Sequence, residues 1–81
     1  MTRSYFVALA FIRDDGDIVP GDAFECPNAM DAALQAQVLC HEVGNIGAVA
    51  YTRTANDVGV LGEAVVIKEF GDVPTDRRML F

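Results

Sequence analysis

The chain has 81 residues, which is room for one domain. Its hydrophobic fraction of 52% is too high for a disordered chain. The net charge of −6 repels nucleic-acid phosphates and anionic lipid headgroups, so we expect no nucleic-acid partner and no membrane partner.

The first predicted element is a strand over Tyr5–Arg13, in which both alternating sets of side chains are apolar. Such a strand is normally central in a sheet and covered on both faces. The run is also far too short to cross a bilayer, which needs about 20 residues. A turn rich in aspartate follows, with Gly16 free to take a positive φ. A weaker strand is predicted within Ile18–Cys26, and Pro20 near its start suits an edge strand.

A helix is predicted over Ala29–Val43, with Asn28 as its N-cap and Gly44 as its stop. Its main apolar face consists mostly of small residues, which recur at three- and four-residue spacing. These are Ala29, Ala32, Ala33, Ala36, Leu39, Cys40 and Val43. A second apolar stripe lies on roughly the opposite side of the helix and consists of Met30, Leu34 and Val38.

Two further strands are predicted over Gly47–Arg53 and Glu63–Phe70, joined by a hairpin connection. The resulting fold class is α+β, a ββαββ chain with a four-stranded, mainly antiparallel sheet and one helix packed on one face. We expect the domain to span residues 1–74 and residues 75–81 to form a flexible C-terminal tail. The strand order stays open. A right-handed crossover runs the third strand parallel to the second, which makes the order second-first-third-fourth wholly antiparallel. The prevalence of antiparallel pairs favours that order, whereas strand hydrophobicity slightly favours the first and fourth strands side by side in the middle.

One helix covers only one face of this sheet. Its small residues are expected to pack on the strand set with the larger side chains, namely Tyr5, Val7, Leu9, Phe11, Val49, Tyr51, Val65 and Ile67. The other face would then be flat, apolar and in need of a partner. It is the favoured candidate interface and includes Phe6, Ala8, Ala10, Ile12, Ala48 and Ala50. The helical stripe of Met30, Leu34 and Val38 is the secondary candidate.

The sequence offers little catalytic chemistry. Cys40 and His41 are adjacent, so on a helix their side chains point about 100° apart and form a poor nucleophile–base pair. The aspartates around the first turn do not match a calcium loop, and the glycines match no phosphate-binding pattern. We therefore predict no catalytic residue, no metal and no cofactor. Cys26 and Cys40 are interpreted as reduced thiols of a cytoplasmic protein.

Two functional hypotheses remain. The first is a small non-enzymatic association module that acts as a homodimer and also has a possible protein partner. The alternative is a small enzyme or ligand-binding protein with a pocket at the subunit interface. Such a pocket needs convergent polar groups, for which the strands offer only Tyr51, Arg53 and Lys68.

Overall fold

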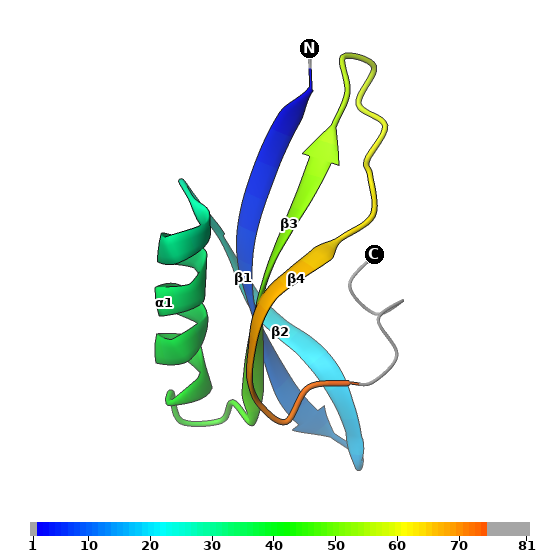
Figure 1. Cartoon of the computed structure of the whole chain (residues 1–81). Helices are drawn as coiled ribbons and strands as arrows, with labels where there is room; N and C mark the ends of the chain where they lie inside the picture. Colours follow the sequence, from blue (N-terminus) through cyan, green and yellow to red (C-terminus); the bar gives the residue numbers. More distant parts are fainter. Residues whose placement is uncertain (1, 75–81) are drawn as a thin grey trace.

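Two β-hairpins, joined through one helix, make up the architecture. The computed structural model describes residues 2–74. Its elements in chain order are β1 (Arg3–Asp14), β2 (Asp17–Cys26), α1 (Ala29–Cys40), β3 (Gly47–Ala55) and β4 (Val65–Gly71). The helix lies against one face of the sheet (Figure 1), so the predicted ββαββ, α+β fold is confirmed. The predicted tail, residues 75–81, lies outside the described residues.

The sheet has the strand order β2-β1-β3-β4, and every neighbouring pair is antiparallel. The central pair is β1 with β3, where Ala8 lies opposite Ala50. Of the two strand orders that the sequence left open, the structure has second-first-third-fourth, and the first and fourth strands are not neighbours. The reason is burial: β1 and β3 each contain four consecutive buried residues, which suits the centre of the sheet, whereas β4 opens on the exposed Val65 and suits an edge.

Local sequence explains how α1 begins and ends. The Asn28 Oδ1 accepts a hydrogen bond from the Asp31 N–H at 2.8 Å, which satisfies one of the free donors of the first turn. The helix ends at Cys40, earlier than predicted, and the Asn45 Nδ2 donates to the Leu39 carbonyl at 2.8 Å. Val43 lies beyond the helix and is fully exposed, so it is not part of the apolar face. Among residues 2–74, no helix has the length and apolar character that crossing a membrane requires.

The helix packs on the alanine face of the sheet. Ala32, Ala36 and Leu39 of α1 are buried against four strand alanines. Those are Ala8, Ala10, Ala48 and Ala50. The expectation that the helix covers the bulky strand set is thus wrong. Small side chains on both surfaces allow the helix and the sheet to approach closely, and larger residues such as Phe6 and Phe70 fill the rim of this contact.

The bulky strand set forms a second cluster on the opposite face. Leu9, Phe11 and Val49 are buried there without any contribution from the helix. Partly buried side chains from the strands and their connections pack around them, namely Ile18, Ile46, Tyr51, Val66 and Val73. The sheet therefore carries apolar clusters on both faces, and the cluster away from α1 is built from strand and loop residues.

Candidate functional site

The sheet face that was the favoured candidate interface is occupied by the helix of the same chain. Ala8, Ala10, Ala48 and Ala50 have no exposed surface. These four residues cannot contact another protein while α1 stays in place. The helix covers this face because small side chains on both the helix and the strands allow them to pack closely. Two further members of the predicted patch, Phe6 and Ile12, are half-buried.

The secondary candidate, by contrast, lies at the surface. Met30 is 73% exposed, and Leu34 and Val38 are each 54% exposed. Their four-residue spacing aligns them along α1 on the side away from the buried Ala32 and Ala36. We call Met30, Leu34 and Val38 the helix stripe. Exposed apolar side chains in a row are what a contact surface for another chain requires.

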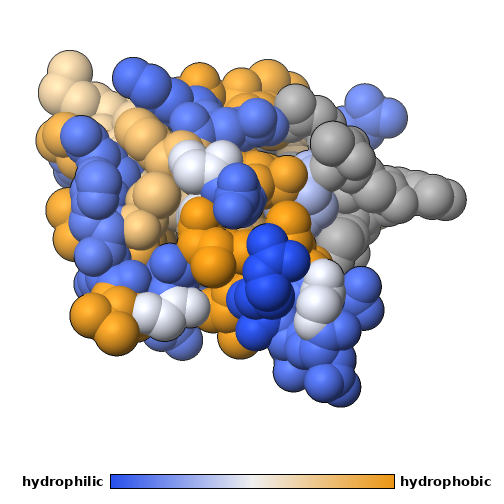
Figure 2. All heavy atoms as spheres, turned by 90° about the horizontal axis from the view of Figure 1, so that it is seen from below, coloured by the Kyte–Doolittle hydropathy of each residue, from blue (hydrophilic) through white to orange (hydrophobic). Residues whose placement is uncertain are grey.

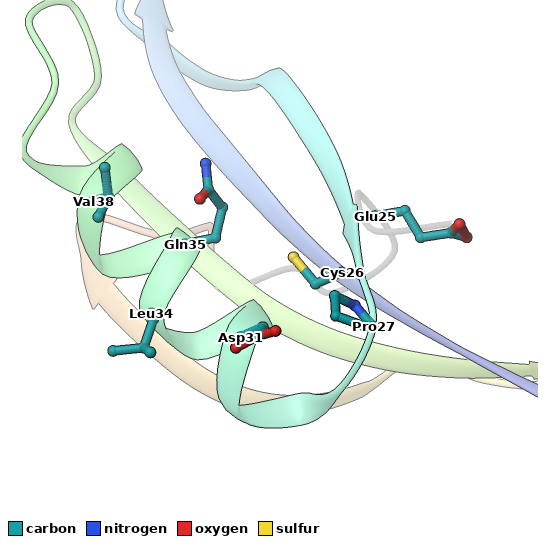
Figure 3. Close-up of a pocket in the computed structure, with 7 residues that line it drawn as sticks. All are labelled: Glu25, Cys26, Pro27, Asp31, Leu34, Gln35 and Val38. Carbon is teal, nitrogen blue, oxygen red and sulfur yellow. The ribbon is translucent and has the colours of Figure 1, made fainter.

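Beside the helix stripe, a groove runs between α1 and the last residues of β2 (Figure 3). It holds about 350 Å³. Its lining residues are Glu25, Cys26, Pro27, Asp31, Leu34, Gln35 and Val38. The Cys26 side chain points toward the helix, whereas Glu25 points away from it (Figure 3). The groove thus has a mixed wall of apolar groups, the Cys26 thiol, the Gln35 amide and the Asp31 carboxylate, while the Glu25 carboxylate lies on the other side of β2.

The thiol of Cys26 is not an activated nucleophile. Burial raises the pKa of Cys26 above its ordinary value of 9.0, and the negative charge of Asp31 raises it further. A backbone hydrogen bond from Ala8 acts in the lowering direction, and Glu25 again raises the pKa. The Cys26 Sγ also lies 3.7 Å from the Phe24 carbonyl, to which it donates. A thiol in this setting stays protonated near neutral pH, which suits packing better than catalysis.

The other reactive side chains are dispersed. Cys40 packs at the edge of the alanine core, while His41 follows the helix and is exposed. Burial raises the pKa of Tyr51, and the nearby Arg53 acts in the lowering direction. The Arg53 Nε donates to the Gly62 carbonyl at 3.1 Å. Within residues 2–74, no three side chains of the ligating types come together as a metal site.

The sequence prediction included two residues that line the groove, Leu34 and Val38 of the predicted stripe, and it did not include the lining residues of β2. The spacing of Asp31, Leu34, Gln35 and Val38 does place them along one side of a helix. Nothing in that spacing shows that Cys26 and Glu25 of β2 lie next to this side, because that depends on which sheet face the helix covers.

Comparison of the chain with models of protein families, with curated proteins and with solved structures returned no match.

Proposed function

We propose that this chain is a small non-enzymatic association module and that the helix stripe is its contact surface. The observation that carries the proposal is the exposure of Met30, Leu34 and Val38 in one row. Seen from the lower end of the molecule in Figure 1 (Figure 2), apolar side chains also reach the surface between hydrophilic ones. Covering apolar area of this kind by a second chain releases about 25 cal/mol for each Å² removed from water.

The first partner to consider is a second copy of the chain. The helix stripe is symmetric about Leu34, so two antiparallel helices related by a two-fold axis would place Met30 of one copy against Val38 of the partner subunit. A domain of this size has a small core, and self-association is a common way to stabilise it.

The groove supports a second candidate, a ligand-binding protein whose pocket is completed at the subunit interface. Leu34 and Val38 belong both to the helix stripe and to the groove wall, so a partner on the stripe would cover part of the groove. The protonated thiol of Cys26 favours binding over catalysis. The proposal includes a cytoplasmic location, supported by the free thiols of Cys26 and Cys40.

Sedimentation velocity at protein concentrations from about 5 to 500 µM tests the dimer. We expect the wild type to form a dimer and Met30→Glu to be monomeric, because the substitution places a charge in the contact. Met30 is exposed in the single subunit, so at concentrations where the wild type is monomeric the free energy of unfolding should change by only about 0.5 kcal/mol.

The matched control is Val58→Glu, which changes an apolar residue that is 82% exposed and lies outside α1. This variant should sediment as the wild type does. A wild type that stays monomeric at every concentration contradicts the dimer, and a Met30→Glu variant that stays dimeric contradicts the helix stripe as its interface.

A further inference from the structure

The groove borders a free edge of the sheet. Within residues 2–74, β2 pairs with β1 alone, so its outer edge presents backbone N–H and C=O groups that no other strand satisfies. The regular stretch next to the groove is Ala23–Cys26, which follows the bulge and contains no proline. An open edge beside a groove that can take alternate side chains is the geometry by which sheets accept an added peptide strand.

The register of β2 defines what the two sides of an added strand would meet. Phe24 pairs with Ala8 of the helix-covered face, and the Cys26 side chain points toward α1 (Figure 3). Glu25 alternates with them and points away from the helix (Figure 3). One side of an added strand would therefore lie along the groove, and its other side would lie next to a carboxylate.

The charges around this edge favour a basic occupant. The Glu25 carboxylate lies on the side of β2 away from the helix and Asp31 lies on the helix side, and the residues that line the groove include no lysine or arginine. Asp22 adds an exposed carboxylate on the same strand. The other edge strand, β4, differs because it carries Lys68, whose Nζ lies 5.4 Å from the centre of the Phe70 ring. A second copy of the chain, with its net charge of −6, is a poor match for the β2 edge.

We propose that the groove and the free edge of β2 bind an extended segment of another protein in which apolar and basic residues alternate. The segment adds to β2 as a fifth strand. Its apolar side chains enter the groove beside Cys26, Leu34 and Val38, and its basic side chains lie next to Glu25. The proposal rests on the chain being an association module, but it does not require the dimer.

A fluorescein-labelled peptide of sequence Lys-Val-Lys-Val-Arg-Val-Lys tests the proposal by fluorescence anisotropy. We expect saturable binding to the wild type, and binding about tenfold weaker to Glu25→Lys, because an opposite-charge pair across two strands becomes a like-charge pair. Asp17→Lys is the matched control. It makes the same charge change on β2 at the hairpin end, beyond Pro20, and should bind as the wild type does.

Two altered peptides separate strand addition from simple charge attraction. Replacing each basic residue by glutamate should abolish binding. Methylating the backbone nitrogens of alternate residues, in each of the two possible phases, should abolish binding in one phase only, because only one set of N–H groups faces β2. In a Cys40→Ser protein, bound peptide should also slow the alkylation of Cys26 by N-ethylmaleimide.

The proposal is overturned if neither the wild type nor the Met30→Glu variant binds the basic peptide, if Glu25→Lys binds it equally well, or if neither methylated peptide loses affinity. The last result would mean charge attraction without strand pairing. Met30→Glu separates this proposal from the dimer, because Met30 does not line the groove. A monomeric Met30→Glu protein that binds the peptide supports both proposals, and a monomeric Met30→Glu protein that does not bind it supports the dimer alone.

Discussion

The alanines between α1 and the sheet set the distance between these two layers. Ala36 is fully buried against the strand alanines, so a larger side chain at this position has no space. We expect Ala36→Leu to lower the free energy of unfolding by about 1–3 kcal/mol, the usual cost of overpacking a core. The midpoint of urea unfolding measures this. Gln37→Leu is the control on the exposed side of the same helix and should change stability little. An Ala36→Leu protein as stable as the wild type would show that the helix can shift away from the sheet without cost.

The same alanines show what could be predicted at the residue scale. Three- and four-residue spacing correctly placed Ala32, Ala36 and Leu39 on the buried side of the helix. It could not determine which sheet face they meet, because both alternating sets of the central strands are apolar. Matching small residues to large ones gave the wrong answer. The bulky cluster of Leu9, Phe11 and Val49 is covered by other strand and loop side chains and does not need the helix.

At the scale of the element, α1 depends on its N-cap. The Asn28 Oδ1 accepts from the Asp31 N–H, and its Nδ2 lies 3.4 Å from the Asp31 Oδ2. We expect Asn28→Ala to lower the free energy of unfolding by about 1 kcal/mol, because the first turn loses a partner for a backbone donor. Asn28→Ser should retain most of the stability. Urea unfolding of both variants measures the difference, and equal loss in the two would argue against a capping role for the side chain.

The helix and the four strands were the part of the fold that the sequence predicted best. Turn residues and the N-cap separated the chain into four strands and one helix, and the structure contains all five. The groove could not be predicted in the same way, because it exists only where the side of α1 meets β2. The position of the groove depends on the strand order and on which sheet face the helix covers, and local sequence patterns determine neither.

For the whole molecule, the raised pKa values of Cys26 and Tyr51 predict a loss of stability in alkaline solution. Burial is the main cause in both cases, from ordinary values of 9.0 and 10.0. The folded state therefore keeps these protons at pH values where the unfolded state has lost them. The stability that these two groups contribute is complete below about pH 8, begins to fall near the unfolded-state pKa values, and is lost as the pH rises through the higher folded-state values.

Urea midpoints measured between about pH 7 and pH 11 should decline with increasing pH. The double variant Cys26→Ser, Tyr51→Phe should decline less, because neither replacement side chain ionises in this range. A steeper or unchanged slope in the double variant would show that other groups cause the alkaline loss. Both residues are only partly buried, so we expect a modest effect.

The central β1–β3 pairing also has a kinetic consequence. Each hairpin joins strands that are close in the chain, but Ala10 and Ala48 pair across about 40 residues of sequence. An isolated hairpin has only marginal stability in water. The alanine surface on which α1 packs is complete only when β1 and β3 lie side by side. Closing the long loop and docking the helix should therefore occur together in the rate-limiting step. Cutting the chain within α1 would leave two hairpins, neither of them with a layer to pack on, so this protein should fold as one cooperative unit or not at all.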